Sequence, residues 1–485
     1  MGSIFEKYLD ITEMIDPIKC IGHVTRVQGL LIESRGPQAV IGEICRIVLN
    51  KYGPEGDQPV IHAEVVGLYD EIVQLMVYGE IGGIEIGCRV IASGACLEVA
   101  VSPKLLGRVL DPLGKPMDGK APVESRVRYP ALANSPDPYR RPRIKERLST
   151  GIRAIDGLLA VGRGQRLGIF AGSGVGKSTL LGMIARNTSA DVNVIALIGE
   201  RGREVNEFIE NDLGPEGLAR SVVVVTPSNS PPLARLRGAY VATAIAEYFR
   251  DQGLDVMFLF DSLTRFARAQ REIGLAYGEP AATRGYPPSM FDSMPKLLER
   301  SGTSEKGTIT GFYTILVDGD DMDEPVSDTV RGILDGHIIL SRNLAQRYHY
   351  PAIDVLGSIS RLANTVSGSK TKEATGVIRR LMADYSDSEV IINVGAYKQG
   401  SNPKIDLAIS KRDDIERFLI QAVEEKSPLS ETLKELGEIT GVEIPEEEMT
   451  EYLPRMILPS AEEDDDDFEE TTLALDTAGL KLIDL

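Results

Sequence analysis

Tryptophan is absent from this 485-residue chain, and cysteine and histidine occur only four times each. The cysteines all lie within the first hundred residues and form no C-x-x-C pair; they are Cys20, Cys45, Cys88 and Cys96. No histidine clusters with them, so the pattern disfavours a zinc site. Buried thiols in a reducing compartment are the simpler interpretation.

Long apolar runs and net positive charge are missing too. No run approaches the ~20 residues that cross a bilayer, and the N-terminus has no signal-peptide core. The formal net charge of −19 disfavours binding to nucleic acid through overall electrostatics. With 42% hydrophobic and 26% charged residues, the composition is that of a soluble globular protein. We therefore expect a cytoplasmic location.

The residue composition and the spacing of apolar residues change several times along the chain, which predicts six regions. Short valine- and isoleucine-rich runs separated by glycine indicate a small closed β-barrel, and helical apolar spacing dominates the C-terminal part. The expected regions are an amphipathic helix (1–18), a β-barrel (19–95), a connector (96–147), a nucleotide-binding domain (148–368), a helical domain (369–458) and an acidic disordered tail (459–485). The first helix either caps the barrel or serves as a docking handle for a partner.

Apolar strands alternate with helical stretches in the central region. We place strands at 167–170, 192–198, 222–226, 256–260, 309–317 and 337–340, and a helix at 233–250. Such βαβ units predict an α/β fold with a mostly parallel sheet covered on both faces. Ligands of such sheets bind at the carboxyl ends of the strands.

One glycine-rich turn lies between the first of these strands and a helix start. This context turns the pattern into a phosphate-binding loop, because backbone N–H groups and a helix N-terminus converge on phosphate oxygens. Ala171 replaces the first glycine of the strict motif, without affecting the Lys-Ser pair. The nucleotide-binding residues are expected to be Gly172, Ser173, Gly174, Val175, Gly176, Lys177, Ser178 and Thr179.

Several charged residues follow strands in an order that suits phosphoryl transfer. Lys177 is expected to reach the β- and γ-phosphates of ATP, and Ser178 offers a hydroxyl to Mg²⁺. Asp261 ends an apolar strand. A carboxylate at this position, after a phosphate-binding loop, can hold Mg²⁺ through water. Arg265, one helical turn later, is a further basic candidate.

A second charged run, Gly199-Glu-Arg-Gly-Arg-Glu204, follows the strand at 192–198. We expect that strand to lie beside the phosphate-loop strand, so that Glu200 faces the γ-phosphate and polarises water while Arg201 contacts the phosphate. A surface run of alternating charge is the alternative interpretation.

Together these motifs and the segment Tyr350-Pro-Ala-Ile-Asp-Val-Leu-Gly-Ser-Ile-Ser-Arg361 resemble the hexameric rotary ATPase superfamily. Within it, the segments at 287–302 and 335–342 resemble the flagellar and type III secretion export ATPases. The resemblance implies a RecA-like core and a homohexameric Mg²⁺-dependent ATPase that energises protein export. It also implies that Glu200 is the catalytic carboxylate, that Tyr350 stacks near the adenine, and that Arg361 is an arginine finger in the neighbouring subunit's site.

Partners are implied by the same resemblance. They are a regulator at the N-terminal helix, a central stalk protein in the ring channel, export substrates and chaperones, and peripheral contact with a membrane export gate. The acidic stretch at 318–328 fails as a calcium loop, because Met322 takes a ligand position and no glycine stands at the sixth. It is either a stalk-facing loop or a solvated acidic loop.

Three other functions compete with an export ATPase. The catalytic subunit of a proton-driven synthase is disfavoured by the export-type segments and by the missing acidic-Leu-Ser-acidic torque motif. The net charge and a barrel without clustered aromatics argue against a ring-shaped RNA translocase. Glu200 speaks against a non-catalytic ring subunit, which lacks the catalytic carboxylate.

Overall fold

The computed structural model describes residues 21–50, 58–317, 321–455, 473–474 and 481–482. The expected N-terminal helix and most of the acidic tail lie outside these residues. The chain forms two compact units, one built mainly from the residues up to Glu98 and the other from most of the remainder. Within the described residues, no helix is long and apolar enough to cross a membrane.

The first unit contains a closed antiparallel barrel with the strand order β1-β2-β5-β4-β3-β6. Its strands are β1 (Ile21–Gln28), β2 (Leu31–Arg35), β3 (Glu43–Val48), β4 (Val60–Tyr69), β5 (Ile72–Val77) and β6 (Arg89–Cys96). Alternate side chains such as Ile32, Ile47 and Leu75 fill the interior and are fully buried. Cys45 and Cys88 lie in this core as buried free thiols, as the sequence predicts. Cys96, at the end of β6, is exposed, so the expectation of a buried thiol is wrong for it, and Cys20 lies outside the described residues. Closure removes the strand edges, so the barrel needs no further pairing.

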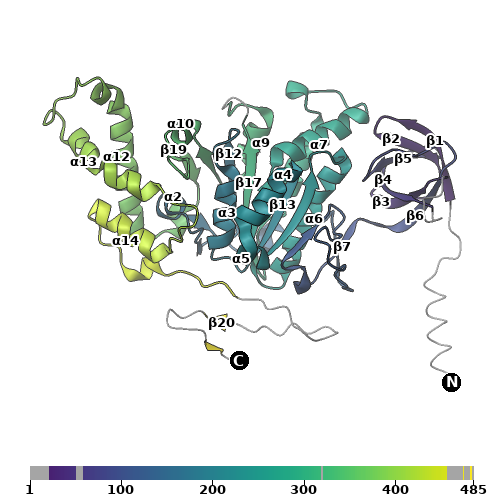
Figure 1. Ribbon diagram of the computed structural model, residues 1–485, viewed down its shortest axis with the longest axis horizontal. Helices are drawn as coiled ribbons and strands as arrows, with labels where there is room; N and C mark the ends of the chain where they lie inside the picture. The colour runs from purple at the N-terminus through teal and green to yellow at the C-terminus, as the bar shows by residue number, and fades with distance from the viewer. Residues whose placement is uncertain (1–20, 51–57, 318–320, 456–472, 475–480, 483–485) are drawn as a thin grey trace. The chain divides into compact units, whose positions relative to one another are not determined.

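A nine-stranded, mostly parallel sheet forms the centre of the second unit (Figure 1). Its main path runs β19-β18-β12-β17-β15-β13-β14-β8, with β16 attached to β17. The strands are β8 (Arg108–Leu110), β12 (Arg166–Ala171), β13 (Val192–Glu200), β14 (Ser221–Pro227), β15 (Asp255–Asp261), β16 (Gly302–Thr303), β17 (Thr308–Leu316), β18 (Gly336–Leu340) and β19 (Ile353–Ser360). All six strands expected from the sequence are present, and β19 alone on that path runs antiparallel to its neighbour.

The strand order corrects one expectation. The strand that leads to Glu200, β13, does not pair with the phosphate-loop strand β12, because β17 and β15 lie between them. Chain order does not fix the order of parallel strands, since each crossover helix can carry the chain past several strands. Glu200 therefore has to approach the phosphate loop across two strands.

Helices alternate with the strands and bury the sheet. They include α2 (Arg153–Leu158), α3 (Lys177–Asn187), α4 (Gly202–Glu207), α5 (Gly214–Ala219), α6 (Pro232–Asp251), α7 (Leu263–Ala276), α8 (Pro288–Leu298), α9 (Pro325–Ile333), α10 (Arg342–Gln346) and α11 (Ala363–Val366). The helix expected at 233–250 is α6. Every residue of β13 and β15 is buried, as strands covered on both faces require.

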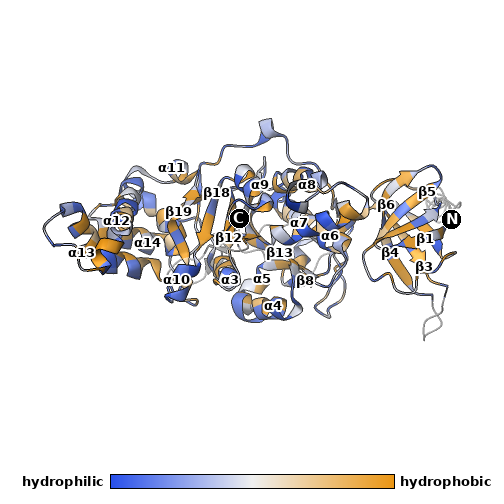
Figure 2. Ribbon diagram, turned by 90° about the horizontal axis from the view of Figure 1, so that it is seen from above, coloured by the Kyte–Doolittle hydropathy of each residue, from blue (hydrophilic) through white to orange (hydrophobic). Residues whose placement is uncertain are grey.

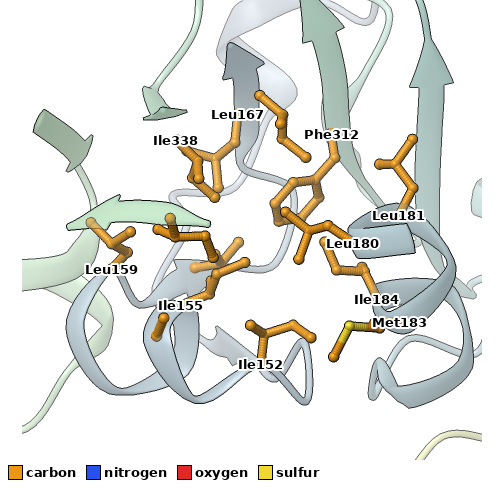
Figure 3. Packing of buried hydrophobic residues seen from close by; sticks show 14 of the residues in the cluster. Ile152, Ile155, Leu159, Leu167, Leu180, Leu181, Met183, Ile184, Phe312 and Ile338 are labelled. Atoms are coloured by element: carbon orange, nitrogen blue, oxygen red, sulfur yellow. The ribbon is translucent and has the colours of Figure 1, made fainter. Parts of the chain in front are cut away.

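The helix that follows the phosphate loop is anchored by a large apolar core. In Figure 3, Leu180, Leu181 and Ile184 lie on the side of α3 that faces the sheet, where Phe312 of β17 and Leu167 of β12 also lie. All these side chains are at most 2% exposed. Burial of each contributes about 1.5–3 kcal/mol, so the helix N-terminus is held at a fixed place beyond the sheet.

The C-terminal region is helical and consists of α12 (Ser369–Asn393), α13 (Pro403–Leu419) and α14 (Leu429–Thr440). In Figure 2 these helices carry apolar stripes, and their buried residues, such as Ile378, Phe418 and Leu433, join the same core as α2 and α3. The helical spacing of Ile405, Ile409, Ile415, Leu419 and Val423 predicts a helix that runs on through Val423, but α13 ends at Leu419. Residues 420–428 form a connection, and Pro428 caps α14.

Candidate active site

The phosphate-binding loop leaves β12 and enters α3 as the sequence predicts. Gly174 and Gly176 have φ angles of 76° and 88°, and Gly176 caps the helix. This left-handed backbone favours glycine, and it turns successive N–H groups toward the same space. The aromatic ring of Tyr350 lies beside the loop, since a Cβ built on Gly176 would come within 3.5 Å of it. The structure thus brings Tyr350 to the nucleotide-binding loop from a segment 174 residues away.

Lys177 bonds the carboxylate at the end of β15. Its Nζ donates to Asp261 Oδ1, and the same oxygen accepts a hydrogen bond from Thr314 Oγ1 at 2.7 Å. Burial alone would lower the pKa of Lys177, but the carboxylates of Asp261 and Glu200 outweigh it and raise that pKa. The lysine is therefore charged, and a bound anion would compete with the Asp261 and Glu200 carboxylates for its ammonium group.

Thr314 is a site residue that the motifs did not reveal. It lies near the carboxyl end of β17, where every neighbour from Ile309 to Ile315 is buried. A hydroxyl in such a strand must find a partner, and here the partner is Asp261. Thr308 and Thr310 belong to the same strand, so residue type alone did not single out Thr314. The signal in the sequence was its position near the carboxyl end of a strand, where ligands of parallel sheets bind.

Glu200 enters the cluster from β13 through a local irregularity. The register between β13 and β14 shifts after Ile198, and Gly199 has a φ of 74°. A bulge of this kind re-aims the next side chain. Glu200 Oε1 lies 3.6 Å from Lys177 Nζ, is buried, and accepts no hydrogen bond from any described residue. A buried carboxylate oxygen without a hydrogen-bond donor is costly, so Glu200 Oε1 is available to a group that binds at this site.

Arg265 at the start of α7 packs against the same bulge. A Cβ on Gly199 would lie 3.0 Å from the Cβ of Arg265, which is tighter than an ordinary contact, and the φ of 74° at this position also favours glycine. Arg265 Nε is buried and has no hydrogen-bond partner among the described residues. The arginine is close enough to lower the pKa of Glu200, so the structure brings it together with the Lys177 cluster.

The electrostatic environment of Glu200 brings its pKa close to neutral pH, so that the ionised and protonated carboxyl are both populated. Burial and the charge of Asp261 raise the pKa of Glu200 to about 7, against the smaller opposing effects of Lys177 and Arg265. A carboxyl with a pKa near neutrality can exchange a proton with water under physiological conditions. Two carboxylates with one ammonium group between them therefore leave Glu200 poised as a base.

Arg201 is not part of this cluster. Its side chain is 75% exposed, and its Nη1 lies 3.5 Å from Glu204 Oε1 on the same helix, α4. Although it is adjacent to Glu200 in sequence, the residue caps the helix with extended backbone, which directs the two side chains apart. The structure places Arg201 at the surface.

Arg361 lies at the amino ends of the parallel strands, whereas the phosphate loop lies at their carboxyl ends. It follows Ser360, which pairs with Gly336 at the start of β18, whereas the phosphate loop follows the end of β12, where Ala171 pairs with Leu340 at the end of β18. Because β12 and β18 are parallel, one chain cannot bring Arg361 to its own Lys177. The guanidinium is exposed, and its Nη2 donates to Arg331 O at 3.3 Å.

The described residues hold no cluster of three or more His, Cys, Asp or Glu side chains suited to a metal. Magnesium does not need one, because it is usually bound through one or two carboxylates, water and substrate phosphates. The oxygens of Ser178, Asp261 and Glu200, the last with its orphaned Oε1, are donors of the kind that Mg²⁺ prefers. The donor set therefore fits Mg²⁺ in the presence of a nucleotide.

Comparisons with known protein families agree with this geometry. Residues 151–360 match the ATP synthase alpha/beta family, nucleotide-binding domain. Residues 24–94 match the β-barrel domain of the same family, and residues 368–438 match the T3SS EscN ATPase C-terminal domain. The three matches follow the order of barrel, parallel sheet and helical region in the structure.

Curated relatives match over most of the chain. The flagellum-specific ATP synthase of Treponema pallidum is 60% identical over 88% of this chain and 95% of its own length. The type 3 secretion system ATPase of Xanthomonas euvesicatoria is 50% identical over 86% of this chain and 94% of its own length. Among solved structures, the assembled ATPase EscN of enteropathogenic E. coli is 43% identical, with a TM-score of 0.80 over 86% of this chain and 100% of that one. A second EscN structure, in complex with its central stalk EscO, matches equally well.

Proposed function

This chain belongs to the family of flagellum-specific ATP synthases and type III secretion ATPases and is an ATPase, and we propose that its active site is shared between neighbouring copies in a homohexameric ring. One copy supplies the phosphate loop with Lys177, Glu200 and Asp261, and the next supplies Arg361. The ring converts ATP hydrolysis into work on proteins that are exported through a flagellar or type III apparatus.

The position of Arg361 carries the proposal. The guanidinium is exposed at the amino ends of the parallel strands, opposite the phosphate loop, where it cannot serve its own site but is accessible to another copy. An arginine supplied in trans stabilises the charge that develops in phosphoryl transfer and is typically worth about 10³–10⁵ in rate. An isolated subunit then holds only part of a site, so hydrolysis depends on ring assembly.

Each residue of the phosphate-loop side has a distinct role in this proposal. The loop N–H groups and Lys177 bind the β- and γ-phosphates, which draw the ammonium away from Asp261. Glu200 orients water for in-line attack and accepts its proton. Tyr350 stacks on the base, and Arg265 stays close to Glu200 and offsets negative charge beside it.

Magnesium would be held by Ser178 and, through water, by Asp261. When bound, it neutralises charge on the β- and γ-phosphate oxygens. Thr314 fixes the orientation of the Asp261 carboxylate for that purpose.

The loop before α9 is the proposed contact for a stalk. Asp321 Oδ2 lies 2.9 Å from Arg284 Nη1, and both side chains are about half exposed. EscN has been solved with its central stalk EscO. In this chain, an exposed acidic loop that forms an ion pair with an arginine suits a stalk with basic side chains. Separately, the N-terminal residues are the proposed contact for a regulator of the export apparatus.

Two substitutions test the shared site. Glu200→Gln should keep ATP binding and ring formation and abolish turnover, because it removes only the base. Arg361→Ala should also keep both and reduce kcat by about 10³-fold or more. Three measurements separate these effects. Turnover is measured at saturating ATP, nucleotide affinity with a fluorescent analogue, and ring assembly by sedimentation. Arg417→Ala, which removes an exposed arginine of α13, is the matched control.

Normal hydrolysis by the Arg361→Ala protein would refute the shared site. Normal hydrolysis by Glu200→Gln would refute only the assignment of the base, since Arg361 is tested separately.

A further inference from the structure

Gln165 is a fully buried amide in the turn between β11 (Val161–Gly162) and β12. Its Oε1 accepts a hydrogen bond from Gly162 N at 2.9 Å. Its Nε2 donates two, to Asp335 O at 3.2 Å and to Ser360 Oγ at 3.0 Å. An amide NH₂ has two protons, so both donors are used.

Both acceptors of this amide adjoin the backbone of Arg361. Asp335 O, which Gln165 binds, also accepts a hydrogen bond from Arg361 N at 3.0 Å. Ser360, the residue before Arg361, donates onward through its hydroxyl to Ala160 O at 2.8 Å. The amide of Gln165 therefore fixes the main chain that leads into the Arg361 Cα, directly at Ser360 and through the shared acceptor Asp335 O at Arg361 N.

Arg166, the first residue of β12, strengthens the same anchor. Its backbone N and its Nε donate to Asp335 Oδ2 at 3.0 and 3.3 Å. The guanidinium also lies 2.6 Å from Glu299 Oε1. Because the other end of β12 carries the phosphate loop, one strand holds the chain's own nucleotide site and the base of Arg361 together.

We propose that Gln165 is a positioning residue for Arg361, which fixes the point from which the arginine reaches the neighbouring copy's ATP. The inference rests on the proposed function, in which Arg361 acts in trans. The side chain of Arg361 is exposed, and among the described residues it makes a single hydrogen bond, to Arg331 O. Its direction therefore depends on a rigid main chain. A displacement of ~1 Å at a catalytic group can cost about 10²-fold in rate.

The substitution Gln165→Glu isolates this role. It keeps the size and the acceptor for Gly162 N, but it replaces the two donors with an oxygen that faces Asp335 O and Ser360 Oγ. We expect kcat to fall about 10²-fold, with the KM for ATP, analogue affinity and ring assembly unchanged. Ser360→Ala removes one of the two links and should give a smaller loss of the same kind, which provides a milder variant if Gln165→Glu does not assemble.

Asn193 offers a matched control. It is equally buried, and its Nδ2 also donates to one backbone carbonyl and one serine hydroxyl, Ala185 O at 2.9 Å and Ser221 Oγ at 3.1 Å. Asn193→Asp therefore removes the same two donors at a place remote from Arg361. A fall in thermal stability without a comparable fall in kcat is expected for this variant.

Mixed rings distinguish a role in trans from damage to the chain's own phosphate loop. Glu200→Gln subunits have an intact Arg361, and Arg361→Ala subunits have an intact phosphate-loop side. In rings assembled from equal amounts of both, about one interface in four combines the intact halves, because each interface takes one half from each subunit. The reference mixture should therefore regain activity that neither variant has alone.

Gln165→Glu subunits mixed with Glu200→Gln subunits should regain activity as the reference mixture does, whereas mixing with Arg361→Ala should not help. If the reference mixture recovers and the mixture of Gln165→Glu with Glu200→Gln does not, the positioning role is wrong and the shared site stands. If the reference mixture itself stays inactive, the shared site fails and this inference fails with it. A kcat for Gln165→Glu equal to that of the unmodified chain also overturns the inference.

Discussion

At the scale of single residues, the candidate site is a crowded set of charges. Lys177 bonds Asp261 and lies 3.6 Å from Glu200, so one cation faces two carboxylates in a largely buried space. A group whose folded pKa lies above its ordinary value stabilises the fold only while it is protonated. For Glu200 this means no cost below about pH 4.5 and a cost that grows as the pH rises through about 7.

Glu200→Gln should therefore stabilise the nucleotide-free protein at high pH. At pH 8 we expect a gain of about 1–3 kcal/mol in the free energy of unfolding, and at pH 5 most of this gain should be lost. Calorimetric melting at both pH values measures it. Glu207→Gln, an exposed glutamate on α4 paired with Arg203, should show no such gain. An equal gain at both pH values would contradict the raised pKa.

At the scale of elements, Arg153 joins the helical region to the nucleotide-binding core. From the start of α2 its guanidinium donates to Phe418 O and Ile420 O at the end of α13 and pairs with Glu425. The last carbonyls of a helix have no partner within it, and a cation there also suits the helix dipole. One side chain thus closes α13 and fixes it against the core.

Arg153→Ala should destabilise the protein by about 2–4 kcal/mol, because two carbonyls and a carboxylate lose their donor. Limited proteolysis should cut residues 420–428 faster, and a lower melting temperature should accompany it. Arg153→Lys should lose nearly as much stability as Arg153→Ala, since an ammonium group cannot span the three acceptors. Arg417→Ala, on the exposed side of α13, should change neither measurement, and a similar loss there would count against the special role of Arg153.

Element by element, the sequence predicted the strands and the helix at 233–250, because apolar strands and amphipathic helices each have a local period. It missed the break at 420–428, since the apolar spacing runs on through Val423 up to Pro428. It placed Arg201 beside Glu200, whereas the structure has the Arg201 side chain exposed at the start of α4, and its contact with the phosphate stays a prediction.

At the scale of the whole molecule, a site divided between copies makes activity depend on assembly. We expect the specific ATPase activity to fall as the protein is diluted, in step with the loss of rings by sedimentation. Analogue binding per subunit should change less, because the phosphate loop belongs to one chain. Arg361→Ala should follow the same assembly curve. Constant specific activity through the range in which rings dissociate would show that a single copy suffices.

The sequence by itself determined the parts of the site that adjoin one another along the chain. The strand, glycine turn and helix around Lys177, the carboxylate that ends β15 and the charged run at Glu200 all follow from local residue types. Tertiary structure alone decided how these parts meet, because the order of parallel strands depends on how distant segments bury one another. That order separates β12 from β13, puts Thr314 against Asp261, and leaves Arg361 at the amino ends of the parallel strands, opposite the phosphate loop and anchored by Gln165.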